Sequence, residues 1–253
     1  MLNLERQAKI LELIEEHGKV EVGDLSRRLR ASEVTIRKDL KELQERGLLR
    51  RAHGGAVRAV TVSADPSLRV KAALHADEKR RIGAAAAALV ADGESIILDS
   101  GTTTQQVARH LKDRRGIKVI TNALNVAAEL AGAGEVEVIL LGGLLRQNSG
   151  SLVGQFAEEM LRRLSVDKLF LAVDAVDLEF GLSTPNLDES HVNQAMVRAA
   201  RETILVADSS KFGRRSLSRI VPLSEVARVV TDHGLPNAMR AGLRELGVEL
   251  ILA

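Results

Sequence analysis

The chain has 253 residues and a formal net charge of only +2, so it is neither strongly basic nor strongly acidic overall. Its length suits two domains, and 45% hydrophobic residues are enough for an aliphatic core. The chain has no cysteine, which excludes disulfides, thiolate catalysis and cysteine-bound metal and fits a cytoplasmic protein. Aromatic residues make up 2% and include no Trp or Tyr, which disfavours base stacking on RNA or single strands.

The amino-terminal region predicts two helices. The first spans Asn3 to His17, and its charged, amphipathic sequence argues against a signal peptide. Val22, Leu25 and Leu29 follow at helical spacing and predict a short second helix that buries one face.

A third helix is predicted directly after these. Ser32 stands where an N-cap belongs, and Ile36, Leu40 and Leu43 recur at i, i+4 and i+7 to face the core. Gly47 is a good residue to end this helix. The opposite face then points to solvent or to a groove and carries Glu33, Thr35, Arg37, Lys38 and Lys41.

A basic hairpin follows the third helix. Arg50 and Arg51 precede His53, and Gly54 and Gly55 permit a sharp tip. A charged helix face is usually only a solvated face. However, residues 27–58 hold ten Lys or Arg against four Asp or Glu, although the whole chain is only +2. This concentration of positive charge favours a winged helix-turn-helix that binds double-stranded DNA.

The sequence therefore predicts a DNA-binding domain over residues 1–58. A linker is expected over 59–76, where periodicity is weak and Asp65-Pro66 interrupts the chain. The predicted DNA contacts are Ser32, Thr35, Arg37, Lys38, Lys41, Arg50, Arg51 and His53.

Residues 77–253 predict an α/β domain. Short apolar runs alternate with helical segments, and the runs are rich in Val, Ile and Leu on both faces, as strands buried on both sides require. A mostly parallel sheet with right-handed crossovers is expected. The predicted strands are Ser95–Asp99, Lys118–Thr121, Val136–Leu141, Lys168–Val173, Thr203–Ala207, Arg228–Thr231 and Glu249–Leu252.

The residues after these strands predict a ligand site, because ligands of such sheets bind beyond the carboxyl ends of the strands. The first strand leads through Asp99 and Gly101 into a helix whose free N–H groups and hydroxyls suit phosphate, although an ordinary helix cap has the same sequence. Arg146 and Lys211 can pair with phosphate, and Asp99, Asn122 and Asp174 with sugar hydroxyls. The predicted site comprises Asp99, Ser100, Gly101, Thr102, Thr103, Thr121, Asn122, Gly142, Gly143, Arg146, Asp174, Glu189 and Lys211.

Other kinds of site lack their residues. There is no Walker A lysine pattern and no GxGxxG that opens a βαβ unit. No two histidines stand at i, i+4, so no metal is predicted. The alanine run at 84–88 is too short to span a bilayer, so no membrane is expected. Apart from a phosphorylated sugar as effector, no cofactor is expected.

These patterns resemble the DeoR family of bacterial transcription regulators over nearly the whole chain. The amino-terminal motif is Ser32, Thr35-Ile36-Arg37, Asp39-Leu40, Gly47-Leu48 and His53-Gly54-Gly55-Ala56. The sensor motif is Asp99, Gly101-Thr102-Thr103, Thr121-Asn122, Gly142-Gly143, Arg146, Gly154, Asp208-Ser209-Ser210-Lys211-Phe212 and Thr231-Asp232.

The resemblance implies a repressor of sugar or polyol catabolism genes that responds to a phosphorylated intermediate. It also implies a sensor fold similar to ribose-5-phosphate isomerase and CoA transferases. The family often has glycines at the fourth strand end, where this chain has residues 171–177 without glycine, so its binding site is expected to be narrower. Residues 183–187 with Glu189 either help to select the sugar or begin a helix with Pro185 in its first turn.

Two functions follow from the sequence. The first is a repressor that acts as a homodimer or homotetramer on a repeated operator, because paired half-sites raise affinity. The second is a sugar-phosphate isomerase or transferase with a DNA-binding appendage, in which Asp174, Glu189 and Lys211 act as acid, base and electrostatic group. The repressor is favoured, because likeness of fold is only an analogy for function.

Overall fold

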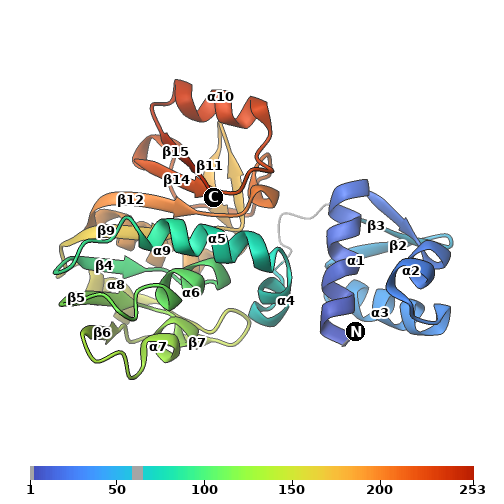
Figure 1. Cartoon of the computed structure of the whole chain (residues 1–253), viewed down its shortest axis with the longest axis horizontal. Coiled ribbons are helices and arrows are strands. Elements are labelled where there is room, and N and C mark those ends of the chain that lie inside the picture. The colour runs from blue at the N-terminus through green and yellow to red at the C-terminus, as the bar shows by residue number, and fades with distance from the viewer. Residues whose placement is uncertain (1–2, 59–64) are drawn as a thin grey trace. The chain divides into compact units, whose positions relative to one another are not determined.

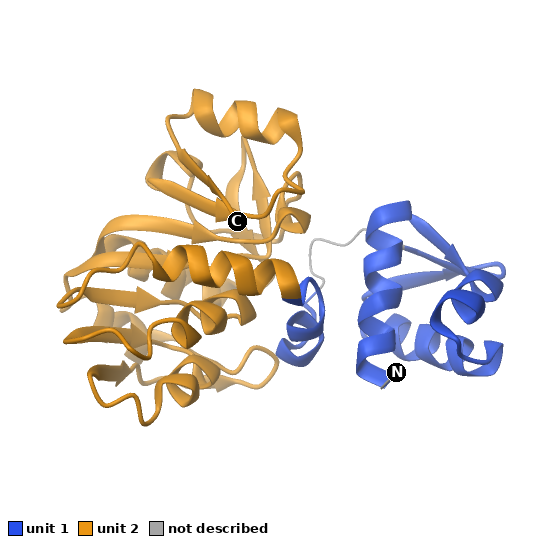
Figure 2. Cartoon of the chain, in the orientation of Figure 1, with its two compact units in different colours: residues 1–76 blue, residues 77–253 orange. Residues whose placement is uncertain are grey.

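The computed structural model of the chain describes residues 3–58 and 65–253. The chain divides into two compact units, unit 1 with residues 1–76 and unit 2 with residues 77–253 (Figure 2). Each unit has its own hydrophobic core.

Unit 1 contains four helices and a small sheet among its described residues (Figure 1). Its elements in chain order are α1 (Asn3–His17), β1 (Lys19–Glu21), α2 (Val22–Leu29), α3 (Glu33–Glu45), β2 (Leu49–Ala52), β3 (Gly55–Arg58) and α4 (Leu68–Ala73). The first helix and the α2-turn-α3 motif confirm the sequence prediction, because α1 has the predicted bounds and α3 follows the predicted cap.

The start and the apolar face of α3 are also as predicted. The Ser32 hydroxyl accepts a hydrogen bond from the Thr35 backbone N–H at 3.2 Å, which satisfies one of the donors that a helix start leaves unpaired. Ile36, Leu40 and Leu43 are fully buried in the core of unit 1. This packing fixes which face of α3 points outward.

The wing is a hairpin of β2 and β3, and β1 pairs antiparallel with β3 to complete a sheet in the order β1-β3-β2. The chain approaches itself closely at Gly55, where a Cβ atom would lie 2.0 Å from the Val20 carbonyl oxygen. Only glycine fits there, so Gly55 allows β1 to pair with the wing. The sequence prediction did not include β1, which has only three residues.

The second half of the predicted linker belongs to unit 1. Val70 of α4 is 2% exposed and lies in the same hydrophobic cluster as Ile10 and Ile14 of α1. The His75 imidazole lies 3.1 Å from the Glu15 carboxylate. Unit 1 therefore extends to residue 76 rather than 58, because six residues of helix are too few to give a periodic signal. Residues 59–64 of the predicted linker lie outside the described residues.

Unit 2 is built on a seven-stranded sheet in the order β15-β14-β12-β9-β4-β5-β6, in which every neighbouring pair is parallel. Its strands are β4 (Ser95–Leu98), β5 (Ile117–Thr121), β6 (Val136–Leu140), β9 (Val166–Leu171), β12 (Ala200–Val206), β14 (Arg228–Thr231) and β15 (Glu249–Leu252). The predicted α/β class and all seven predicted strands are confirmed.

Helices cover both faces of this sheet, since each face belongs to a different hydrophobic cluster. One face packs against α5 (Ala76–Ala87), α6 (Thr102–Arg109) and α7 (Leu124–Leu130). The other packs against α8 (Gln155–Leu161), α9 (Leu187–Ala199) and α10 (Asn237–Glu245). Alternate residues of β4 serve the two clusters, with Ile97 on one side and Ile96 and Leu98 on the other. A sheet covered in this way leaves mainly the ends of its strands open to ligands.

Two small antiparallel sheets were not predicted. One pairs β7 (Leu144–Arg146) with β8 (Ser151–Val153), and the other has the order β10-β11-β13. The second consists of β10 (Ala175–Asp177), β11 (Gly181–Thr184) and β13 (Ser218–Arg219). Thr184 ends β11 and Asn186 caps α9, so Pro185 precedes the helix and does not stand in its first turn.

Candidate functional site

The outward face of α3 and the wing carry most of the side chains predicted to contact DNA. Arg37, Lys38 and Lys41 are exposed on α3, and Ser32 is exposed at its cap. Thr35 is half-buried, and its hydroxyl lies 2.9 Å from that of Ser32. This face can therefore meet a large charged surface without rearrangement of the core.

Two of these cations have acidic neighbours on the same helix. Arg37 Nη2 lies 2.7 Å from the Glu33 carboxylate, and Lys41 Nζ lies 3.9 Å from that of Glu45. Both are exposed i, i+4 pairs, which contribute only about 0.3–0.5 kcal/mol. Such weak pairs leave the two cations available to phosphates.

Val34 was missed by the sequence prediction. Its side chain is 75% exposed on the first turn of α3, beside the predicted DNA contacts. The sequence did contain a signal for this exposure, because Val34 does not share the helical spacing of the buried residues Ile36, Leu40 and Leu43. An exposed apolar side chain on this face is suited to a thymine methyl group, which the major groove presents.

A second missed feature fixes the position of α3. The guanidinium of Arg6 on α1 binds both carboxylate oxygens of Asp39 on α3, at 2.5 and 3.1 Å. Asp39 is 1% exposed, and this hydrogen-bonded pairing raises the pKa of Arg6. Because Asp39 stands next to Leu40 on the buried face, it needs a buried cation, which α1 supplies.

The wing places its predicted contacts on the surface as well. Arg50, Arg51 and His53 are all exposed. Arg50 and Arg51 are consecutive in β2, so their side chains leave opposite faces of the strand. The two arginines therefore face different surroundings when the wing lies on a duplex.

In unit 2 the predicted ligand residues gather at the carboxyl end of the sheet. Asp99 to Thr103 follow β4, Thr121 and Asn122 lie at the end of β5, and Asp174 follows β9. Gly101 caps α6, and Glu189 lies in the first turn of α9. The topology thus brings together segments that are far apart in the sequence.

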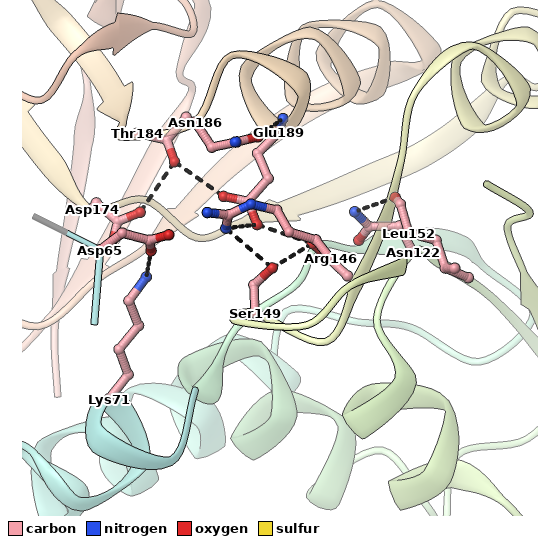
Figure 3. A network of polar contacts seen from close by, with 11 residues as sticks. Asp65, Lys71, Asn122, Arg146, Ser149, Leu152, Asp174, Thr184, Asn186 and Glu189 are labelled. Carbon is pink, nitrogen blue, oxygen red and sulfur yellow. Dashed lines mark hydrogen bonds and ion pairs between the residues drawn. The ribbon is translucent and has the colours of Figure 1, made fainter. Parts of the chain in front are cut away.

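A buried polar network joins several of these residues (Figure 3). Arg146 Nη1 lies 3.0 Å from the Glu189 carboxylate, which also accepts a hydrogen bond from the Ser151 hydroxyl at 2.9 Å. The Thr184 hydroxyl lies 3.1 Å from the Asp174 carboxylate and 3.4 Å from that of Glu189. Arg146 is therefore already paired, and a phosphate must compete with Glu189 for it.

Asp99 stands at the buried edge of this network. It is 2% exposed, and burial raises its pKa to about 8, with a further contribution from the charge of Glu189. Hydrogen bonds from the backbone N–H groups of Ser100 and Ala172 oppose the shift only in part. At neutral pH the Asp99 carboxyl is therefore mostly protonated and can donate a hydrogen bond.

Among the predicted site residues, two buried side-chain oxygens lack a hydrogen-bond partner within the described ranges. They are Oδ1 of Asp99 and Oδ1 of Asn122. The other end of the Asn122 amide donates to the Leu152 carbonyl at 3.3 Å, which holds the group in place. Buried polar atoms without a partner are rare in folded proteins, so Oδ1 of Asn122 is suited to a hydroxyl donor of a ligand, and the protonated Asp99 carboxyl to an acceptor.

Three other predicted residues, Gly142, Gly143 and Lys211, make no hydrogen bond or ion pair with this network among the described residues. Gly143 allows a close approach, because a Cβ atom there would lie 2.5 Å from the Val153 carbonyl oxygen. Gly142 donates its N–H to the Met160 sulfur at 3.3 Å. Within residues 3–58 and 65–253, no hydrogen bond or ion pair joins the Lys211 ammonium to the network. A ligand-binding role for these three residues stays a prediction.

The described part of the chain contains neither a metal-binding cluster nor a membrane-spanning helix. No group of three or more His, Cys, Asp or Glu side chains is arranged to hold a metal ion there. No helix there is long and apolar enough to cross a membrane.

Comparison with known proteins gives matches over both units. Residues 6–62 match the model of the DeoR-like helix-turn-helix domain, and residues 74–233 match the DeoR C-terminal sensor domain. The chain is 42% identical to a protein of Escherichia coli O157:H7 that carries the name "Putative aga operon transcriptional repressor", over 98% of this chain and 93% of that one. It is 39% identical to the HTH-type transcriptional regulator GlpR of Haloferax volcanii, over 99% and 98%.

A further relative is the transcriptional repressor AccR of Agrobacterium fabrum, with 37% identity over 98% of this chain and 97% of the relative. Among solved structures, ribose 5-phosphate isomerase A of Methanocaldococcus jannaschii matches with a TM-score of 0.41 and 20% identity, over 54% of each chain. eIF2B delta of Chaetomium thermophilum matches with a TM-score of 0.45 and 16% identity, over 61% of this chain and 55% of that one.

Proposed function

Because this chain belongs to the DeoR family of transcriptional regulators, we propose that it represses an operon for the catabolism of a sugar or polyol. In this proposal, a phosphorylated sugar bound in unit 2 controls the affinity of unit 1 for operator DNA. One observation carries the proposal: an exposed cationic helix face and a buried polar site at the ends of a parallel sheet occur in the same chain.

Operator binding is assigned to α3 and the wing. Thr35, Arg37 and Lys38 enter or flank the major groove, and Val34 packs against a thymine methyl. Lys41, His53 and one of the two wing arginines, Arg50 or Arg51, contact phosphates and add an affinity that depends on salt but not on sequence. The core pair of Arg6 and Asp39 holds α3 in register.

Effector binding is assigned to the network of unit 2. The phosphate lies at the start of α6, where the first N–H groups of a helix are free, and it competes with Glu189 for Arg146. Since an unpaired buried carboxylate is costly, the sugar must offer hydroxyl donors to Glu189 in exchange. This requirement favours a ligand with both a phosphate and several hydroxyls over inorganic phosphate.

Effector and DNA are coupled through two states of the chain. A ligand shifts such an equilibrium only by its different affinity for the two states. We propose that the chain acts as a homodimer or homotetramer, because two helix-turn-helix units on paired half-sites bind far more tightly than one. Since its target is chromosomal DNA, we place the protein in the cytoplasm.

The test is a DNA-binding titration of the full chain at fixed salt, using the region upstream of its own gene. A panel of sugar phosphates is compared with the same sugars without phosphate. Specific binding that changes with one phosphorylated sugar, but not with its dephosphorylated form, is expected. Specific binding that ignores every sugar phosphate would overturn the assignment of unit 2.

Arg37→Ala tests the placement of α3 in the same assay. We expect a loss of affinity of about 1–3 kcal/mol if the guanidinium reads a base, because that is the range for a bidentate contact. Arg80→Ala is the matched control, since Arg80 is an exposed arginine of unit 2 in a comparable pair with Asp77. Unchanged affinity of Arg37→Ala would show that α3 lies elsewhere on the DNA.

We further propose that unit 2 senses its ligand without converting it. In an isomerase or transferase Asp174, Glu189 and Lys211 would have to act together. Asp174 and Glu189 are joined through Thr184, but Glu189 is paired with Arg146, and Lys211 has no contact with either within the described ranges. Turnover of ribose 5-phosphate or a hexose 6-phosphate that depends on Lys211 would contradict this proposal.

A further inference from the structure

The segment that leads from unit 1 into α5 contains a residue in a rare backbone conformation. His75 has a φ of +50°, in the left-handed region that residues other than glycine seldom adopt. Its backbone N–H donates to the Glu12 carboxylate at 3.2 Å, and its imidazole lies 3.1 Å from the Glu15 carboxylate. His75, Glu12 and Glu15 are called the His75 latch below. Such a conformation persists only where surrounding contacts hold it, and it is common in segments that switch between two states.

The His75 latch holds the chain directly before α5. The helix α4 ends at Ala73 and α5 begins at Ala76, so only Leu74 and His75 separate the two helices. Val70 of α4 is buried against α1, and both carboxylates of the latch also belong to α1. The helix before the latch and the latch itself are therefore both fastened to α1.

The same helix α1 also holds α3, which carries the predicted DNA contacts. Arg6 binds Asp39, and the Gln7 side-chain amide donates to the Glu42 carboxylate at 2.7 Å. Gln7 is 2% exposed, so this second contact is shielded from water. Arg6 and Gln7 lie in the first half of α1, whereas the two latch carboxylates lie in its second half. One continuous helix thus connects the latch to α3.

Within unit 2, α5 is packed closely on α6. A Cβ atom at Gly83 of α5 would lie 2.5 Å from the Cβ of Gln106 on α6 and 2.7 Å from its backbone carbonyl carbon, so no side chain separates the two helices there. Ile82 and Ala86 of α5 are fully buried in the hydrophobic cluster that α6 shares. Because packed interiors have little room to deform, a displacement of α6 also displaces α5.

We propose that the His75 latch has a closed and an open state and couples the phosphate site of unit 2 to α3. The proposal rests on the proposed function, in which a phosphate lies at the start of α6. A phosphate there displaces α6 and with it α5, and this movement reaches His75 because α5 begins at the next residue. When the latch opens, the left-handed conformation of His75 relaxes and the second half of α1 is released. The orientation in which α3 reads DNA then changes, since α3 is bound to the first half of α1.

The first test uses the full chain without DNA or sugar, so it does not depend on the proposed function. Gly83→Ala forces α5 away from α6, because the new Cβ has no space. Hydrogen exchange of peptides from residues 68–76 should then rise about tenfold, although these residues belong to unit 1. Gly134→Ala is the matched control, since a Cβ there meets no atom within 4 Å, and it should leave this exchange unchanged.

A second exchange experiment opens the latch directly and does not need the Gly83→Ala variant, whose folding is checked by circular dichroism. Glu15→Ala removes the carboxylate that meets His75. Exchange of peptides from α3 should rise about threefold, because α1 transmits the opening. Glu16→Ala is the matched control, since Glu16 is the neighbouring carboxylate of α1 and is 69% exposed beside His17. It should leave the exchange of α3 unchanged.

The third test measures the coupling between sugar phosphate and operator. His75→Gly keeps the left-handed backbone without strain and removes the imidazole that meets Glu15. The variant should still bind the sugar phosphates of the panel, measured by calorimetry. A sugar phosphate that changes the operator affinity of the wild type about tenfold should change that of His75→Gly less than about twofold. Arg30→Gly is the matched control, because Arg30 also has a φ of +50° but ends α2, and it should keep the wild-type response.

Three results would overturn the proposal. These are unchanged exchange of residues 68–76 in a folded Gly83→Ala variant, equal exchange of α3 in Glu15→Ala and Glu16→Ala, and a wild-type response to sugar phosphate in His75→Gly. If no sugar phosphate changes the operator affinity of the wild type, the proposed function fails, and the two exchange experiments still decide whether the latch exists.

Discussion

Units 1 and 2 present their functional side chains in opposite ways. On unit 1 the predicted contacts Arg37, Lys38, Arg50 and Arg51 are exposed, and within the described residues at most one acidic neighbour pairs with each. On unit 2 Arg146 and Glu189 are largely buried and bound to each other. The exposed set can meet a rigid, highly charged duplex directly. In our proposal the buried set binds its ligand only by exchanging existing partners, which would make binding selective and couple it to a conformational change.

The largest expected effect is a fall in the stability of unit 2 as pH rises, caused by the buried carboxyl of Asp99. Because burial raises the pKa of Asp99 to about 8, the folded state holds this proton more tightly than the unfolded state does. The resulting stability is fully present below about pH 4, where the unfolded carboxyl is also protonated, and is lost as pH rises towards 8. The loss is at most about 5 kcal/mol over this range, and relaxation of the site reduces it.

Asp99→Asn keeps the group neutral and removes this pH dependence. Unit 2 of the variant should match the wild type at pH 4 and be more stable at pH 8. Hydrogen exchange of peptides from unit 2, in the full chain, measures the stability of unit 2 at both pH values. A difference between variant and wild type that is the same at both pH values would contradict a raised pKa.

The next effect concerns the Arg6–Asp39 ion pair, which supports the exposed set by holding α3 in place. Arg6→Ala leaves the Asp39 carboxylate buried without its cation and should destabilise unit 1 by about 3 kcal/mol. Arg27→Ala is the matched control, because Arg27 pairs with Asp24 in solvent and should change stability by less than about 1 kcal/mol. The free energy of unfolding of unit 1 in both variants is measured by denaturant unfolding, monitored through hydrogen exchange of peptides from unit 1. Equal effects of the two variants would show that Arg6 is not a support of α3.

The sequence predicts the helices and strands of both units better than it predicts the contacts between their side chains. The seven central strands were predicted within three residues at each end, because strands buried on both faces are continuous apolar runs. The outward face of α3 followed from the spacing of Ile36, Leu40 and Leu43. The pairs Arg6–Asp39 and Arg146–Glu189 were not predicted, since the partners are 33 and 43 residues apart and only tertiary packing joins them. Strand ends show which groups gather at a site, but not which of them already bind one another.

A smaller effect separates the two arginines of the wing. Arg50 and Arg51 leave opposite faces of β2, so only one of them is expected to face the duplex. Its alanine variant should lower the slope of log affinity against log salt by about 0.9, the contribution of one phosphate contact. The other variant should leave the slope nearly unchanged. Equal reductions of the salt slope in the two variants would mean that both faces of the wing contact DNA phosphates.

The smallest effect concerns Val34, the apolar member of the exposed set. If Val34 packs on a thymine methyl, Val34→Ala should weaken operator binding by about 1 kcal/mol, because it removes apolar contact area. Replacing thymine by uracil at one operator position after another removes the methyl from the DNA side instead. The wild type should lose affinity at one position, and Val34→Ala should be insensitive at that same position. If both proteins respond equally to every uracil, Val34 does not read the base, and the exposed set acts through charge and polar contacts.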